Sequence, residues 1–263
     1  MIDRWLTVGV VEDGQWRATD RGSPQGASLS PLLANVFLHY VFDLWADHWR
    51  RTRADGDVII TRYADDFVVG FQHEQEARQF LADLRDRFAQ FGLALHPDKT
   101  RLIEFGRHAA QRRAGRGDRG SPETFDFLGF THICGKSRKG GKFWVKRITI
   151  AKRMRAKLKV LKDELRHRRH QPLQVQGMWL RRVFQGHLNH YAVPGNWHAV
   201  GQFRTQLSRL WLRALRGRSQ RGRRLTWAKM NEHIDRWLPP VRIVHPYPNV
   251  RLAARTQGRS PVR

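Results

Sequence analysis

Two adjacent carboxylates, Asp65 and Asp66, are the residues of this sequence best suited to do chemistry. They stand in RYADDFVVGF, residues 62–71, where β-branched and aromatic residues flank a short polar centre, and residues 58–61 (VIIT) extend the apolar run. The pattern predicts a strand, a tight turn and a returning strand, with both arms buried. Because neighbouring carboxylates repel each other, we expect a divalent cation to neutralise them. The alternative is an Asp-Asp pair that simply turns a hairpin.

Phosphoryl transfer is the chemistry that such a pair suits, because it needs hard oxygen ligands that hold Mg²⁺ against substrate phosphates. Tyr63-Ala64-Asp65-Asp66 resembles the YxDD sequence of reverse transcriptases, and alanine in the second position is similar to the version of group II intron-encoded proteins. The resemblance implies that Asp65 and Asp66 are catalytic and bind two Mg²⁺ ions, and that Tyr63 contacts the substrate.

The composition favours a nucleic-acid partner. The chain has 263 residues with 40% hydrophobic content, enough for one or two packed domains. Its 49 Lys and Arg against 23 Asp and Glu give a net charge of +26, which is typical of proteins that bind a polyanion. Between residues 151 and 224 there are 19 basic and two acidic residues, a concentration that basic residues scattered for solubility do not predict.

The single cysteine, Cys134, excludes an internal disulfide and a cysteine-based zinc cluster, and it is typical of a reducing compartment. No apolar run approaches membrane-spanning length, and the N-terminal residues show no signal-peptide pattern. We therefore expect a soluble protein of the bacterial cytoplasm, associated with the nucleoid, with no membrane partner.

Ahead of the carboxylates, the sequence predicts a hairpin over residues 7–19 and a long, largely buried helix that begins at Ser30 as N-cap. Pro24-Gln25-Gly26 lies between them, and small side chains there let a bound ligand approach the backbone. An ordinary connecting loop is the alternative. The order of loop, helix and YADD is similar to that of reverse transcriptases, which implies that Pro24, Gln25 and Gly26 line the nucleotide and template pocket.

After the YADD sequence, apolar residues at helical spacing predict a helix over residues 73–91, with Phe91 on its buried face. A strand pair or an extended segment follows over residues 93–105. The resemblance implies that Lys99 in this segment neutralises phosphate charge beside the active site, although a lone lysine is more often a solvated surface residue. Residues 107–122, rich in Arg and Gly, predict a flexible loop that touches RNA.

Residues 125–133 predict a strand, and residues 135–141 turn the chain back into a second one. Within this stretch Phe127, Leu128, Gly129 and Phe130 resemble the hairpin with which reverse transcriptases grip the primer. A plain core hairpin is the alternative interpretation.

From residue 149 the sequence predicts a basic amphipathic helix and then helices over residues 174–191, 197–216 and 225–238, which together make a small bundle. Its cations would bind the phosphates of a structured RNA with strong salt dependence. The bundle resembles the thumb, or maturase X domain, of group II intron proteins. The expected RNA-binding residues are Arg153, Arg155, Lys157, Lys159, Arg168, Arg169, Arg181 and Arg182.

The fold class expected from these elements is α+β. Residues 1–148 are expected to form a partial reverse-transcriptase palm, an antiparallel sheet packed on helices, and residues 149–240 an all-α basic bundle, with a tail over 241–263. The family's fingers and its first palm motif, with a third metal-binding Asp, have no counterpart before Tyr63. We therefore expect the chain to begin inside the palm, with the third carboxylate ligand outside this chain. A dimer or a complementing N-terminal half is the expected protein partner.

The expected function is that of an RNA-directed DNA polymerase with maturase activity. The resemblance implies an RNA template, a DNA primer, dNTPs, Mg²⁺ and group II intron RNA as partners. Two other classes stay open: a catalytically inactive, RNA-binding splicing cofactor, and a reverse transcriptase of a retroelement or a defence system.

Overall fold

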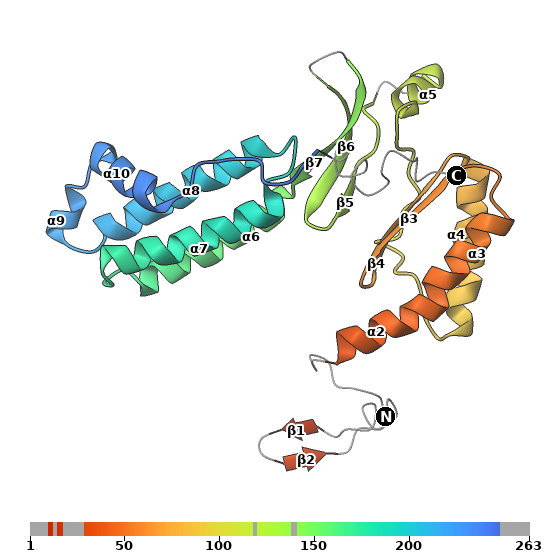
Figure 1. Ribbon diagram of the computed structural model, residues 1–263, viewed down its shortest axis with the longest axis horizontal. Coiled ribbons are helices and arrows are strands. Elements are labelled where there is room, and N and C mark those ends of the chain that lie inside the picture. Colours follow the sequence, from red (N-terminus) through yellow and green to blue (C-terminus); the bar gives the residue numbers. More distant parts are fainter. Residues whose placement is uncertain (1–9, 13–14, 18–28, 118–119, 138–140, 248–263) are drawn as a thin grey trace. The chain divides into compact units, whose positions relative to one another are not determined.

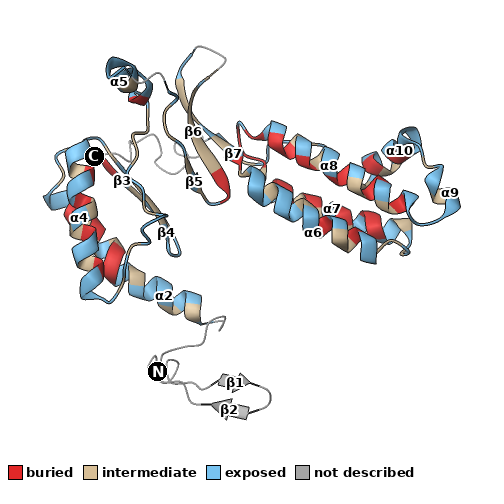
Figure 2. Cartoon of the chain, turned by 180° about the vertical axis from the view of Figure 1, so that it is seen from behind, coloured by how far each residue is buried: buried red, intermediate tan, exposed pale blue. Residues whose placement is uncertain are grey.

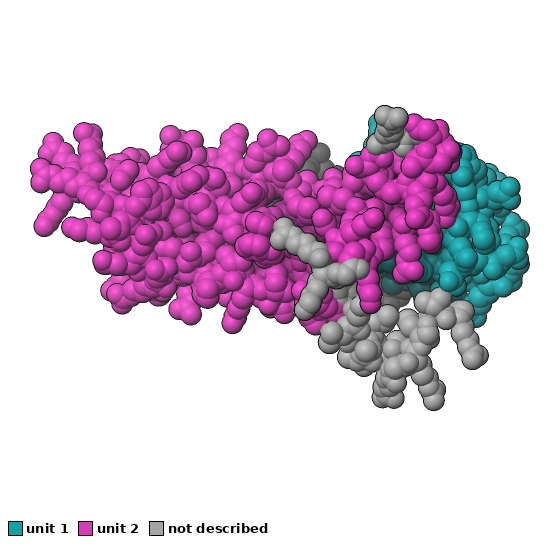
Figure 3. Space-filling model, turned by 90° about the horizontal axis from the view of Figure 1, so that it is seen from above, with its two compact units in different colours: residues 1–102, 262–263 teal, residues 103–261 magenta. Residues whose placement is uncertain are grey.

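The computed structural model describes residues 10–12, 15–17, 29–117, 120–137 and 141–247 (Figure 1). The chain divides into two compact units, Met1–Leu102 with Val262–Arg263, and Ile103–Pro261 (Figure 3). The boundary between palm and thumb expected at residue 148 therefore lies inside the second unit. The loop Pro24-Gln25-Gly26 lies outside the described residues.

The predicted N-terminal hairpin is present in its described part. Strands β1 (Val10–Glu12) and β2 (Gln15–Arg17) pair antiparallel, with Glu12 opposite Gln15.

The helix predicted after residue 30 is confirmed, but its first half is not buried. It runs through α2 (Ser30–Leu38), the π-helical η1 (His39–Asp43) and α3 (Leu44–Thr52), with Leu29 rather than Ser30 at the N-cap position. No residue of α2 is buried, and Leu32 is 54% exposed. Burial begins at Val41 and Phe42, the first residues of the helical run that belong to the core of the first unit.

The core of the first unit lies between η1, α3, the YADD hairpin and α4 (Glu74–Gln90), and the buried positions of α4 recur along one side of the helix (Figure 2). Trp49 joins α3 to α4, because its Nε1 donates to Oδ2 of Asp83 on α4 at 2.7 Å. The helix predicted over residues 73–91 is confirmed. Phe91 was expected on its buried face, but it lies just beyond α4 and is 41% exposed. The buried members of the core are Val41, Phe42, Ala46, Trp49, Val58, Phe80, Leu84 and Phe88.

Strands β3 (Val58–Tyr63) and β4 (Asp66–Phe71) form the predicted hairpin as a two-stranded antiparallel sheet. The expectation that both arms are buried is wrong. Val58 is buried, but its neighbour Ile59 is 60% exposed, because successive side chains of a strand point to opposite faces and the core covers one of them.

Residues 93–105 contain no strand, so the predicted strand pair is wrong. The segment is irregular and includes a turn over residues 97–99. The stretch 107–122, predicted as a flexible loop, contains the short helix α5 (Ala109–Gly115), whose Ala109 is buried. Glu104 pairs with Arg116 and lies 3.9 Å from Arg112 Nε, which offsets the positive charge that the sequence concentrates here.

Strands β5 (Phe125–Phe127), β6 (Phe130–Lys136) and β7 (Phe143–Thr149) form a three-stranded antiparallel sheet in that order. The stretch predicted as one strand, 125–133, is therefore two strands. Leu128 and Gly129 have positive φ angles of 49° and 86°, and they turn the chain between Phe127 and Phe130. Two successive positive φ angles are typical of the type I′ turn, whose twist suits a two-residue hairpin.

The predicted bundle is confirmed as α6 (Ala151–His167), α7 (Leu173–Tyr191), α8 (Trp197–Arg216) and α10 (Trp227–Trp237), with a short α9 (Gln220–Arg223) that was not predicted. Figure 2 shows its buried residues along the helices. Phe184, Phe203 and Trp211 are fully buried in it. Trp211 Nε1 donates to Gln176 Oε1 at 3.0 Å, so this buried indole nitrogen is paired. None of the described helices is long and apolar enough to cross a membrane.

Candidate functional site

The YADD turn is a two-residue loop at the tip of the β3–β4 hairpin. Tyr63 pairs with Asp66, and Ala64 and Asp65 form the loop. Ala64 has a φ angle of 53°, and a positive φ at the first loop residue alone is typical of a type II′ turn. All four residues are exposed, and Tyr63 is 65% exposed. The expected carboxylate pair is therefore presented to solvent on a tight turn.

Arg62, the last residue before the YADD sequence, fixes this turn to the helical run of the first unit. Its Nε and Nη2 donate to the two carboxylate oxygens of Asp43 at 2.7 and 2.6 Å. Its Nη1 donates to Asn35 Oδ1 at 2.9 Å and to the carbonyl oxygen of Ala64 at 2.8 Å. One guanidinium thus joins α2, η1 and the loop of the hairpin.

The electrostatics of this cluster follow from the same contacts. The hydrogen bond from Arg62 holds the pKa of Asp43 below its usual value, and the same bond raises the pKa of Arg62. Arg62 has a side chain that is only 13% exposed, so its charge needs a partner. Asp43 supplies it in the bidentate geometry that guanidinium and carboxylate favour.

Sequence reasoning missed Arg62, Asp43 and Asn35. The available signal was an arginine inside an otherwise apolar strand, because a half-buried arginine needs an acceptor. What no sequence pattern gave is the π-helical turn that contains Asp43. Such turns are frequent at functional sites.

The two carboxylates of the turn have the donor chemistry that Mg²⁺ requires. Mg²⁺ usually takes one or two protein carboxylates and completes its shell with water and substrate phosphates. Neither Asp65 nor Asp66 forms an ion pair within the described ranges, so their oxygens are available. Across the residues that the structure describes, no group of three or more His, Cys, Asp or Glu is placed to hold a metal.

Lys99 lies on an exposed turn of the segment after α4, where its backbone N–H donates to the carbonyl oxygen of His96 at 3.3 Å. No hydrogen bond or ion pair joins Lys99 to the YADD turn in the part of the chain that is described. Of the predicted substrate residues, the structure therefore brings together Tyr63 and the two carboxylates, as neighbours on one hairpin.

The predicted primer-grip residues form the tip of the β5–β6 hairpin, and this tip packs on the end of α7. The carbonyl oxygen of Leu128 lies 3.2 Å from His190 Nε2, and the Phe130 ring stacks on the His190 ring with centroids 5.6 Å apart. Gly129 and Phe130 are buried, while Leu128 is 37% exposed and Phe127 half-buried. One side of the tip is thus held by the bundle, and Phe127 and Leu128 stay partly accessible.

Six of the eight predicted RNA-binding residues carry exposed, unneutralised charge. Among the described residues none of the six forms an ion pair with an acidic group. Arg168 and Arg169 are engaged in the bundle: Arg168 Nε lies 3.1 Å from Glu164 Oε2, and Arg169 Nη1 donates to the carbonyl oxygen of Gly217. The exposed six are Arg153, Arg155, Lys157, Lys159, Arg181 and Arg182.

Comparison with known proteins identifies the family. The family model described as reverse transcriptase (RNA-dependent DNA polymerase) matches residues 1–132, just over half of the chain. The chain therefore belongs to the reverse transcriptase family.

Two matching relatives are both described as group II intron-encoded protein LtrA, one from Lactococcus lactis subsp. cremoris and one from strain MG1363 of that subspecies. Each is 49% identical to this chain over 39 residues, which is 15% of this chain and 6% of the relative. These matches confirm the resemblance inferred from the YADD sequence, over a small part of the relatives' length.

Proposed function

We propose that this chain is a reverse transcriptase of group II intron type. It transfers deoxynucleotides to the 3′-OH of a DNA primer on an RNA template, and it binds intron RNA as a maturase. The family match includes the YADD turn, and the similarity to LtrA supports the group II type. The observation that carries the proposal is the exposed pair Asp65 and Asp66 on a turn that Arg62 holds in place.

In this proposal Asp65 and Asp66 hold Mg²⁺. The bound metal supplies charge stabilisation at the transferred phosphoryl group. Arg62 keeps the loop that carries the carboxylates in one position, since catalysis of this kind depends on positioning. Tyr63 and the loop Pro24-Gln25-Gly26 contact the nucleotide and the template, and Lys99 offsets phosphate charge.

The second unit contributes nucleic-acid binding to the proposal. Phe127, Leu128, Gly129 and Phe130 hold the primer end by shape and backbone contacts, with Phe127 and Leu128 accessible to it. Residues 149–240 act as the thumb or maturase domain, in which the unpaired cations of α6 and α7 bind RNA phosphates. Residues 1–148 correspond to the palm.

Primer extension by the full chain tests the proposal. A labelled DNA primer annealed to an RNA template is incubated with dNTPs and Mg²⁺. We expect the wild-type chain to extend the primer and the Asp65→Ala/Asp66→Ala variant to lose extension. The matched control is Asp55→Ala/Asp57→Ala, which removes two exposed carboxylates at the other end of the same hairpin and should retain extension. Equal extension by all three chains would rule out the assigned site.

The second candidate is a non-catalytic splicing cofactor that only binds RNA. The net charge of +17 between residues 151 and 224 favours it, because this charge serves RNA binding whether or not the turn is catalytic. The same assay separates the two candidates. No extension by any of the chains, together with salt-sensitive binding of intron RNA, supports the cofactor.

A further inference from the structure

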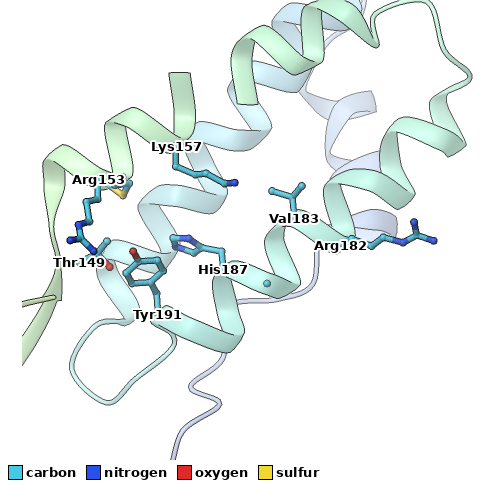
Figure 4. A pocket seen from close by; sticks show the side chains of 9 residues that line it. Thr149, Arg153, Lys157, Arg182, Val183, His187 and Tyr191 are labelled. Atoms are coloured by element: carbon cyan, nitrogen blue, oxygen red, sulfur yellow. The ribbon is translucent and has the colours of Figure 1, made fainter. Parts of the chain in front are cut away.

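A pocket of about 410 Å³ lies between α6 and α7 (Figure 4). Arg153, Met154 and Lys157 line it from α6, and Val183, His187 and Tyr191 line it from α7. Its volume is that of a small-molecule site and exceeds what a lone phosphate group needs. The pocket was not foreseen from the sequence, which indicated a basic helix face and no concave site.

The charge at this pocket is positive and not neutralised. Arg153 and Lys157 are exposed, neither pairs with an acidic group in the described ranges, and no acidic residue lines the pocket. At the other end of α6 the situation differs, because Glu164 there pairs with Arg168 at 3.1 Å. The pocket end of α6 is therefore the one that attracts an anion.

His187 gives the pocket a polar group that the fold itself leaves unpaired. The residue is 9% exposed, and its ring is fixed by stacking on Phe203, with centroids 3.7 Å apart and planes 8° apart. Its Nε2 is buried and has no hydrogen-bond partner among the described residues. Figure 4 shows the ring projecting from α7 toward the side where Lys157 and Tyr191 lie. Buried polar atoms are nearly always paired, so this Nε2 needs a partner that the described residues do not supply.

The protonation state of His187 defines what it can recognise. Burial lowers its pKa to about 4, with further contributions from His190 and Lys157. At pH 7 the imidazole is therefore neutral, and its Nε2 offers one donor or one acceptor rather than a charge. Such a group suits the polar edge of a nucleobase.

We propose that this pocket binds one unstacked nucleotide of an RNA strand. Its phosphate lies at Arg153 and Lys157, and its base lies against Tyr191 with its edge at His187 Nε2. The inference rests on the proposed function, since it takes RNA as the ligand. Proteins bind unpaired bases of RNA in this way, with an aromatic side chain under the base and a polar group at its edge. The apolar side chains of Met154 and Val183 favour a base over an inorganic anion.

Matched lysine substitutions test the pocket in the full chain. Lys157→Ala and Lys159→Ala each remove one exposed lysine from α6, and only Lys157 lines the pocket. Affinity for a fluorescein-labelled single-stranded RNA is measured by anisotropy at two salt concentrations. Loss of one charge should weaken binding about twofold to threefold in both variants. In Lys157→Ala the pocket contact is lost as well, so its total loss of affinity should reach about tenfold. Arg153→Ala and Arg155→Ala form a second such pair.

A fully paired RNA duplex separates a nucleotide pocket from a plain phosphate site. The duplex offers phosphates but no unstacked base. On the duplex, Lys157→Ala should therefore lose no more affinity than Lys159→Ala. If the extra loss of Lys157→Ala persists on the duplex, the site binds backbone phosphate alone and the proposal is overturned.

Substitution of His187 gives an independent test of the pocket. His187→Phe keeps a ring that can stack on Phe203, and we expect it to weaken single-strand binding about fivefold without changing the salt dependence, because no charge is lost. Circular dichroism checks its fold, and His187→Gln repeats the measurement with a smaller polar group.

Equal losses for Lys157→Ala and Lys159→Ala on the single strand overturn the pocket and leave RNA binding by the bundle intact. No RNA binding by the wild-type chain overturns both the pocket and the proposed maturase function.

Discussion

Arg62 and Asp43 form a bidentate ion pair between a strand and a π-helical turn, with nitrogen to oxygen distances of 2.7 and 2.6 Å. The same guanidinium also donates to the carbonyl oxygen of Ala64, inside the loop that carries the paired carboxylates. The position of the YADD turn relative to the helical run therefore depends on Asp43, nineteen residues away from Arg62 in the chain.

Asp43→Asn should lower the free energy of unfolding at pH 7 by about 1–2 kcal/mol, because it removes the charge that compensates a mostly buried guanidinium. Arg62 holds the pKa of Asp43 below its usual 3.8. The carboxylate therefore stabilises the fold above about pH 4 and loses this effect as the pH falls through the lower, folded pKa. Urea unfolding followed by circular dichroism should show a difference from wild type at pH 7 that shrinks as the pH is lowered through the folded pKa.

The control for this variant is Asp47→Asn, which removes a half-buried carboxylate whose partners on α3, Arg50 and Arg51, are exposed. It should cost at most about 0.5–1 kcal/mol, the typical value of surface pairs. Equal costs for both variants would mean that the pair of Arg62 and Asp43 does not position the hairpin.

Gly129→Ala should destabilise the second unit more than Gly141→Ala. Both glycines have positive φ angles, 86° and 62°. A Cβ at Gly129 would lie 3.0 Å from Tyr191 Oη, whereas one at Gly141 meets nothing within 4 Å. We expect about 1 kcal/mol for Gly141→Ala and about 2–3 kcal/mol for Gly129→Ala, measured by thermal unfolding. Adding Tyr191→Phe should recover part of the difference, and no recovery would contradict the packing of the hairpin tip on α7.

The stability of the bundle should fall as the pH drops from 7 to 5 because of His187. Burial lowers its pKa to about 4, with Lys157 on α6 and His190 on its own helix adding to the effect. In the unfolded chain His187 binds its proton near pH 6.5. The contribution of the neutral imidazole to the free energy of unfolding is therefore fully present above that pH and is lost as the pH falls toward 4. The expected loss at pH 5 is about 2 kcal/mol.

His187→Phe should flatten this dependence in urea unfolding measured at pH 7, 6 and 5. The control is His198→Phe, at an exposed position on α8, which should leave the dependence in place. An unchanged slope in His187→Phe would show that another group causes the acid sensitivity.

Asn196→Ala should be among the most destabilising single changes in the second unit. Asn196 is 1% exposed, and its Nδ2 donates to Thr149 Oγ1 and to the carbonyl oxygen of Tyr191, both at 2.8 Å. Its Oδ1 accepts from the Thr149 N–H at 3.0 Å. Loss of three buried hydrogen bonds should cost about 2–4 kcal/mol in chemical unfolding. The double variant Asn196→Ala/Thr149→Val should lose about 1 kcal/mol less than the sum of the two single variants. Full additivity would contradict the direct bond between the two side chains.

Local patterns in the sequence predicted much of this protein. Apolar spacing gave the bundle helices, because a helix that buries one face must repeat its apolar residues every three to four positions. The YADD motif predicted both the hairpin and the family, because the motif and its turn are built from consecutive residues. The pattern of residues 125–133 predicts one strand and hides the turn, because Leu128 is an unusual residue for a position with positive φ.

The contacts between residues far apart in the chain were decided only by the tertiary structure. No periodicity shows that Arg62 meets Asp43 and Asn35, that Gly129 packs under Tyr191, or that one face of β3 stays exposed. The unpaired Nε2 of His187 is likewise invisible in the sequence, because a histidine on an apolar helix face looks the same whether or not a partner reaches it. Local propensity depends on neighbours in sequence, whereas the pairing of buried polar groups depends on which elements pack together, and packing is decided by the whole fold.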